Sequence, residues 1–247
     1  MSNPTYNLVI HDRNWVMEKI ATHVQKYLPN SKLSEKTDLD ADINFYFNWH
    51  GMKQKTNFDV CFFTHIEKGA ENYWNMVGRN CDVAVTMCQK YFVTVPQDKA
   101  VLFKIPPFEN FLPQKPIKIL ICGRAYNSGR KNFEAARALK GMPNVELTFT
   151  EGKLSESSLK KAYEDTDYVL VTSKIEGGPM CVVEALAMNK PVIAPDVGWC
   201  WEFPVIRYQN EEHLKNIIEN ISFPNTIWKD TVSKLNRDIY EIFNSRS

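Results

Sequence analysis

The sequence contains little glycine and almost no excess of charge. Ten glycines occur in 247 residues, and none lies in the G-x-G-x-x-G pattern of a dinucleotide site or the G-x-x-x-x-G-K-[S/T] pattern of a P-loop. The formal net charge is +1, from 30 Lys and Arg against 29 Asp and Glu. These absences argue against a nicotinamide dehydrogenase and a P-loop NTPase. A nucleic-acid partner is not indicated by charge and would need a local basic groove.

Long apolar runs and paired cysteines are also missing. No run approaches the roughly 20 residues that cross a bilayer, so we expect no transmembrane segment. The first residues, MSNPTYNLVIHDRN, do not resemble a secretory signal peptide. The six cysteines are scattered without a C-x-x-C pair, which favours reduced thiols in apolar surroundings. We therefore expect a cytoplasmic protein.

What the chain does contain is an alternation of apolar runs and amphipathic segments. In the first half, helices are predicted at 14–28 and 69–81. Strands are predicted at 6–11, 42–50, 59–67, 82–87 and 100–106. The proline-rich stretch PPFENFLPQKP then interrupts either element type and predicts a linker, with the break near Leu112.

The second half repeats the alternation more regularly. Strands are predicted at 117–123, 145–151, 167–173 and 190–198, and helices at 132–142, 155–166 and 180–189. Continuous apolar strands separated by amphipathic helices are typical of parallel sheets covered on both faces. We therefore predict two doubly wound α/β domains, 1–112 and 113–225, facing one another across a cleft. The segment 226–247 is predicted to form a helix that packs on the first domain.

One stretch, SKIEGGPMCVVEALAMNKPVIAPDVG, places two carboxylates around a helix start. Glu176 lies where a predicted strand ends, and Glu184 lies on the helix that follows. Gly177 and Gly178 permit close backbone approach, and Pro179 suits the first helical turn. The amides of Met180 and Cys181 would face an anion at that helix start. Two acids on either side of an anion site suit a molecule with hydroxyls at both ends and phosphate between them, as in a sugar nucleotide.

This stretch resembles retaining glycosyltransferases of the large family 4 type, which have the GT-B fold. Glu176 and Glu184 match the family's Glu-x7-Glu motif, with S-x-x-E-G-G-P before it and E-A-L-A-M-N-K-P-V-I-A after it. Upstream, ICGR followed by RKNFEAARAL resembles the family's Gly-Arg…Lys element. Three elements in the family's order cover roughly 117–203. The resemblance implies a metal-independent hexosyl- or pentosyltransferase that takes a nucleotide-diphosphate sugar as donor and needs no cofactor.

The resemblance also implies a role for each matching residue. Glu184 would bind the ribose and Glu176 the donor sugar. Arg124, after Gly123, and Lys131 would neutralise the diphosphate, with Arg130 as the rival cation. The resemblance places His65 at a strand end that faces the donor sugar. The further donor-binding candidates are Gly177, Gly178, Pro179, Met180 and Cys181.

Several alternatives stay open at this point. The acceptor is an unidentified hydroxyl of a glycan, a lipid-linked compound or a small molecule. The same chemistry on a macromolecule such as modified DNA, as in phage-type DNA glycosyltransferases, is an alternative in which runs such as GMKQK contact phosphate. A non-catalytic or epimerase-like nucleotide-sugar-binding protein is another. His11 is the alternative to His65 as the histidine that faces the donor. Trp199 and Trp201 either stack on the ligand or close the core.

Overall fold

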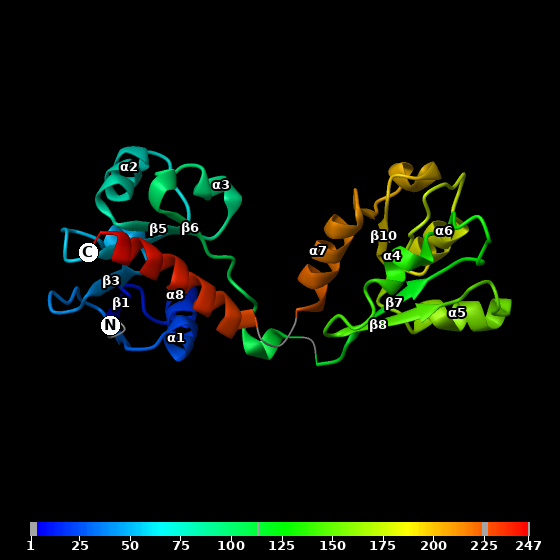
Figure 1. Ribbon diagram of the computed structural model, residues 1–247, viewed down its shortest axis with the longest axis horizontal. Helices are drawn as coiled ribbons and strands as arrows, with labels where there is room; N and C mark the ends of the chain where they lie inside the picture. Colours follow the sequence, from blue (N-terminus) through cyan, green and yellow to red (C-terminus); the bar gives the residue numbers. More distant parts are fainter. Residues whose placement is uncertain (1–3, 113, 224–226, 247) are drawn as a thin grey trace. The chain divides into compact units, whose positions relative to one another are not determined.

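A computed structural model describes residues 4–112, 114–223 and 227–246. The chain divides into two units, drawn in Figure 1. The first contains the chain up to Pro106 together with the last helix, and the second begins at Pro107. The predicted boundary residues 113, 225 and 226 lie outside the described residues, as does the predicted start of the last helix at Thr226.

The first unit is a parallel sheet of six strands in the order β2-β1-β3-β4-β5-β6. Its strands are β1 (Tyr6–Val9), β2 (Ser31–Ser34), β3 (Ile43–Tyr46), β4 (Asp59–Phe63), β5 (Val83–Thr86) and β6 (Ala100–Leu102). Its helices are α1 (Val16–Tyr27), α2 (Glu71–Asn80), α3 (Gln89–Phe92) and α8 (Ile227–Ser245). The central strands are buried on both faces, as their continuous apolar sequences require.

The second unit is a parallel sheet of five strands in the order β11-β10-β9-β7-β8. Its strands are β7 (Ile117–Ile121), β8 (Val145–Phe149), β9 (Tyr168–Leu170), β10 (Val192–Ala194) and β11 (Ile206–Arg207). Its helices are α4 (Phe133–Arg137), α5 (Glu156–Glu164), α6 (Met180–Ala187) and α7 (Glu211–Ser222). Two apolar clusters form its core, one containing Ile119 and Phe133 and the other containing Leu120 and Val182.

The two sheets share one topology. In both, the second strand lies outside the first, and the third strand pairs with the first strand's other edge. The chain therefore reverses its direction of winding between β1 and β3, and again between β7 and β9. In open α/β sheets the crevice at the carboxyl ends of two such strands is the usual ligand site. The prediction of two Rossmann-like α/β domains is confirmed.

Helix α8 packs on the first unit, as predicted. It lies against α1 and β6, and Tyr6 on β1 donates a hydrogen bond from its hydroxyl to the Asn236 side chain at 2.7 Å. The rings of Phe58 and Phe243 meet edge to face with 5.1 Å between their centroids. The apolar stripe of this amphipathic helix includes Val232 and Ile239, both fully buried.

The elements differ from prediction in a few places. The helix expected at 132–142 is limited to α4, because Asn132 takes a left-handed conformation before it and its end tightens into turns at 138–140. Pro179 precedes helix α6 with an extended ψ of 106° instead of opening its first turn. The strands β2 and β11 and the helices α3 and α7 were not predicted. Among the described residues no helix has the length and apolar character needed to span a membrane.

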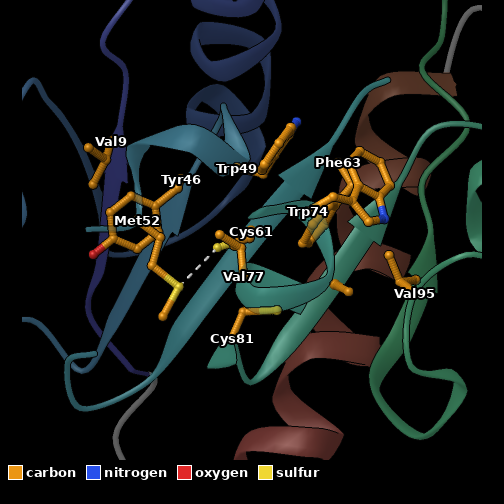
Figure 2. Close-up of a cluster of buried hydrophobic side chains, with 11 residues drawn as sticks. Val9, Tyr46, Trp49, Met52, Cys61, Phe63, Trp74, Val77, Cys81 and Val95 are labelled. Atoms are coloured by element: carbon orange, nitrogen blue, oxygen red, sulfur yellow. Dashed lines mark hydrogen bonds between the residues drawn. The ribbon is translucent and has the colours of Figure 1, made fainter. Parts of the chain in front are cut away.

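Aromatic side chains fill the core of the first unit. Figure 2 shows Trp49, Phe63 and Trp74 packed together above Met52, Cys61 and Cys81. The rings of Phe63 and Trp74 meet edge to face at 4.7 Å between centroids. The aromatic segment FYFNWH is therefore mainly a core element, since four of its six side chains are buried. All six cysteines are free thiols, and five of them are buried.

Candidate functional site

The candidate site of the second unit forms at the carboxyl ends of β7 and β9. The loop after β7 carries Gly123, Arg124, Arg130 and Lys131, and the loop after β9 carries Glu176. The two loops are joined by hydrogen bonds, since the Thr172 hydroxyl donates to the Lys131 carbonyl at 2.7 Å. Lys174 donates its N–H to the Arg130 carbonyl at 2.8 Å. The strand reversal between β7 and β9 thus brings together two sequence motifs about fifty residues apart.

Lys131 and Glu176 form an ion pair that is largely withdrawn from solvent. The Lys131 ammonium contacts Oε1 of Glu176, and the two side chains are 14% and 8% exposed. Ser173 also donates its hydroxyl to Oε1, at 2.8 Å. Burial works to raise the pKa of Glu176, but the hydrogen bonds from Lys131 and Ser173 and the Lys131 charge outweigh it, so the pKa is lowered. Glu176 is therefore a charged carboxylate at neutral pH.

Arg130 and Lys131, the two candidates for the same diphosphate-binding role, lie in different surroundings. The Arg130 guanidinium stacks over the Tyr126 ring at 4.3 Å from its centroid. Of these two cations, only Lys131 forms an ion pair with Glu176. Gly123 makes room for it, because a Cβ there would lie 3.2 Å from the Lys131 side chain, and its φ of +142° also suits glycine. The Gly123 N–H donates to Thr150 at 3.0 Å, so this amide is already bound within the protein.

Arg124 is exposed, and its guanidinium has no acceptor among the residues that the structure describes. Its backbone packs closely against Gly152, which the sequence did not single out. A Cβ at Gly152 would lie 3.0 Å from the Arg124 Cβ and 3.1 Å from its Cα. Gly152 also has a φ of +74°, which side-chain-bearing residues rarely adopt. The close packing on Gly152 thus restricts the base of the Arg124 side chain. The exposed guanidinium at its end is available to an anion.

Glu184 lies on α6 and binds a tyrosine that sequence reasoning missed. The Tyr163 hydroxyl, at the end of α5, donates to Oε2 of Glu184 at 2.6 Å. Burial, followed by the neighbouring Cys122 and Glu184, raises the pKa of Tyr163 well above its ordinary value, so it stays a donor. Oε2 of Glu184 is fixed by this bond, while Oε1 has no hydrogen-bond partner among the described residues. Nothing in the sequence spacing pairs residues 163 and 184.

Helix α6 starts behind a tightly packed glycine loop. Gly178 faces the Trp199 ring, and a Cβ there would lie 2.9 Å from three ring atoms. Trp199 also donates its backbone N–H to the Gly177 carbonyl at 3.2 Å. Its ring therefore holds the loop, while Trp201 is 65% exposed. The N–H groups of Met180 and Cys181 lie in the first turn of the helix, where no carbonyl within the helix can accept from them. They point toward the carboxyl ends of the strands.

The two glycines of this loop differ in the space around them, which gives a direct test. Neither lies in the left-handed region, and a Cβ at Gly177 would meet nothing within 4 Å. We expect Gly178→Ala to lower the free energy of unfolding by about 1–3 kcal/mol because it overpacks the Trp199 ring. Gly177→Ala should stay within about 0.5 kcal/mol of wild type. Equal losses for both variants in denaturant titrations would contradict this packing.

Two buried thiols lie beneath the site. Burial raises the pKa of Cys181 to about 12. It raises that of Cys122 to about 11, against weaker opposing effects from Tyr163 and Lys131. Both thiols stay protonated at neutral pH, which excludes them as nucleophiles there. Among the described residues, no three His, Cys, Asp or Glu side chains are grouped as metal ligands.

The histidine candidates belong to the first unit. His65 follows β4, is exposed at 55% of its side chain, and has Nδ1 3.0 Å from the Thr64 hydroxyl. His11 follows β1 and packs on Gly51, where a Cβ would lie 2.5 Å from the imidazole. Both lie at the carboxyl edge of the first sheet, and the role of His65 toward a donor sugar stays a prediction.

Sequence reasoning missed a third histidine at that edge, His50. The Asn48 side-chain oxygen accepts the His50 backbone N–H at 3.1 Å, so it must also accept from the ring Nδ1 at 2.7 Å. The Asn48 amide donates to Asp12 at 3.3 Å. Burial lowers the pKa of His50. The neutral ring therefore carries its proton on Nδ1 and presents Nε2 as an acceptor.

Comparison with known proteins links part of the chain to sugar transfer. The profile of a family described as "Glycosyl transferases group 1" matches residues 107–203. This segment contains every candidate residue of the second unit. The match supports glycosyl transfer as the function of that segment. Among curated proteins, no sequence matches this chain significantly.

The solved structures that match the chain share little sequence with it. The apo form of the lipopolysaccharide outer core galactosyltransferase WaaB is 12% identical over 98% of this chain and 99% of its own, with a TM-score of 0.35. A sucrose-phosphate synthase from Thermosynechococcus elongatus is 14% identical over 94% and 75%, with a TM-score of 0.36. A glycosyltransferase from Rickettsia africae is 13% identical over 98% and 95%, with a TM-score of 0.34. None of these likenesses assigns a substrate to this chain.

Proposed function

We propose that the protein is a retaining glycosyltransferase of the family 4 type that moves a hexose or pentose from a nucleotide-diphosphate sugar to an acceptor hydroxyl. The observation that carries the proposal is the Lys131–Glu176 ion pair at the β7–β9 reversal, next to the start of α6. A cation and helix N-terminal amides beside a carboxylate match two parts of such a donor, its diphosphate leaving group and its sugar hydroxyls.

Each residue then has a distinct task. Glu184 accepts hydrogen bonds from the ribose diol with the oxygen that Tyr163 leaves free. Glu176 binds hydroxyls of the transferred sugar. Lys131 has three N–H donors, so it can keep Glu176 and still contact a phosphate oxygen. Arg124 supplies a second cation from the exposed end of the loop.

Charge stabilisation of the departing diphosphate is the main catalytic effect in this proposal. The leaving group gains negative charge as the glycosidic bond breaks, and fixed cations and amides stabilise it without reorganisation. Because these groups supply the positive charge, we propose that the reaction needs no metal ion. We expect turnover to be unchanged within about twofold after chelation with EDTA. A loss that added Mg²⁺ or Mn²⁺ restores would contradict this.

We also propose an acceptor class and a cellular compartment. The acceptor is a hydroxyl of a glycan, a lipid-linked compound or a small molecule. Transfer to a macromolecule such as modified DNA is kept as the alternative. Six free thiols suit a reducing compartment, which favours the cytoplasm.

The proposal is tested by finding the donor first. Nucleotide sugars are screened by thermal shift, because a ligand that binds only the folded state raises the melting temperature. Compounds that stabilise the protein are then assayed for release of free nucleoside diphosphate, with and without candidate acceptors. Stabilisation by no nucleotide sugar or nucleoside diphosphate at millimolar concentration would refute a donor site in this chain.

A further inference from the structure

A second basic site lies in the first unit, away from the carboxyl ends of its strands. A cavity of about 540 Å³ is lined by Asp82 and Lys99, which directly precede β5 and β6. Arg79 at the end of α2, Arg246 beyond α8 and Lys55 before β4 also line it. These residues come from five different segments and meet at the amino-terminal edge of the sheet. Nothing in the proposed transfer reaction uses this edge.

The charge of the cavity is strongly one-sided. Its described lining holds five cationic side chains and one carboxylate, a surplus of four positive charges. The cations are Lys53, Lys55, Arg79, Lys99 and Arg246. The whole chain has a formal net charge of only +1, so positive charge is concentrated here. Such a concave cationic surface attracts anions more strongly than the same charges spread over the protein.

The single carboxylate is already saturated. Asp82 contacts the Lys55 ammonium through Oδ2 and the Arg246 guanidinium through Oδ1. Its Oδ2 also accepts the Asp59 backbone N–H at 2.7 Å. Asp82 therefore fixes the end of α8 to the sheet and cannot also neutralise Lys99 or Arg79. Three cations of the lining, Lys53, Arg79 and Lys99, are left without a carboxylate partner among the described residues, and Lys53 lies over the Tyr73 ring instead.

Lys99 is the unusual member of the group, since it is a lysine with only 7% of its surface exposed. Its ammonium donates to the carbonyls of Arg79 at 2.7 Å and Cys81 at 2.6 Å. These carbonyls end helix α2 and hold the ammonium in place. A lysine has three N–H donors, and the third has no acceptor in the part of the chain that the structure describes. A buried charge with an unused donor at a cavity wall is arranged to bind an anion.

The remaining wall is mostly apolar, apart from Gln54 and Asn80. Met52, Val77 and Cys81 belong to the buried cluster drawn in Figure 2. All three line the cavity, together with the partly exposed Met76. Flexible thioethers adapt to differently shaped apolar groups. The cavity thus has a cationic end for an anionic group and a methionine wall for an apolar one.

We propose that this cavity binds a small phosphorylated molecule, with the phosphate on Lys99 and Arg79 and its apolar portion on Met52 and Met76. A phosphomonoester carries nearly two negative charges and three acceptor oxygens, which matches two unneutralised cations. The volume is that of a small-molecule pocket. The cations converge on one cavity instead of forming a stripe, which favours a compact ligand over a phosphodiester polymer.

The experiment uses the methionine methyl groups as local probes. Full-length protein with labelled Met methyls is titrated with phenyl phosphate and, separately, with inorganic phosphate, while NMR follows Met52 and Met76. We expect saturable shifts of both methyls, with phenyl phosphate binding more tightly because it also contacts the thioethers. Met52 and Met76 belong to the first unit and the proposed donor site to the second, and the titration is repeated with Arg124→Ala, which lacks a donor-site cation, so the two proposals fail independently.

Two charge-neutralising variants give the matched comparison. Arg79→Gln removes an exposed cation that the fold does not need, and we expect it to weaken phenyl phosphate binding about fivefold or more. Lys229→Gln removes an exposed cation in the first turn of α8, about 25 Å along the helix from Arg246, and should change nothing. The proposal is overturned if the shifts do not saturate, if both variants bind alike, or if an oligonucleotide binds more tightly than phenyl phosphate.

Discussion

Glu176→Gln is expected to lower turnover with the true donor about a hundredfold or more while leaving nucleoside diphosphate affinity almost unchanged. Contacts to the transferred sugar must strengthen as the ring gains positive charge, and removing such a contact typically costs about 2.7–4 kcal/mol. The amide oxygen still accepts from Ser173 or Lys131, so the loop keeps its shape. Lys131 loses its counter-charge, which if anything strengthens its attraction to the diphosphate.

The second glutamate should respond differently to the same substitution. Glu184→Gln keeps an acceptor for the Tyr163 hydroxyl and removes only the charge offered to the ribose. We therefore expect it to weaken donor and free nucleoside diphosphate alike. The measurement is paired, with calorimetric titration of the diphosphate into both variants followed by turnover. If both variants lost diphosphate affinity to the same degree, the assignment of sugar and ribose to Glu176 and Glu184 would be wrong.

The second large effect concerns the cations of the β7–α4 loop. Arg124→Ala and Lys131→Ala should each weaken nucleoside diphosphate binding about tenfold or more, and nucleoside binding much less. A charge-assisted contact to phosphate is worth roughly 1.5–3 kcal/mol. Lys160→Ala, which removes an exposed cation on α5, is the control and should bind like wild type. Diphosphate affinities equal to wild type would place the phosphate site elsewhere.

The two cation variants differ in their effect on the fold. Arg124 has no partner among the described residues, so its removal tests binding alone. Lys131→Ala also leaves the largely buried Glu176 carboxylate without its cation, which destabilises the loop. The double variant Lys131→Ala, Glu176→Gln removes this penalty and should recover stability without recovering diphosphate affinity. Recovery of both would mean that Lys131 acts only by holding the loop.

The sequence was a good guide wherever a local pattern decides the structure. Largely apolar runs such as IKILI and DVCFF are typical of buried parallel strands, and each became an interior strand of its sheet, with only Lys118 exposed among these residues. The alternation with amphipathic helices then specified two parallel sheets. Short or polar elements carry no such signal, which is why β2, with the sequence SKLS, and β11, with only two residues, were missed.

For the candidate site, the motif by itself supplied the loop residues, from Arg124 to Glu184, because they are contiguous with recognisable strand ends. Only the tertiary structure decided which of them touch. The strand reversal beside β7 places Lys131, not Arg130, on Glu176, and the end of α5 brings Tyr163 to Glu184. Contacts of this kind depend on strand order and helix position, which no spacing within one segment records. The cationic cavity at Lys99 arises in the same way, since five segments unremarkable in sequence meet at one edge of a sheet.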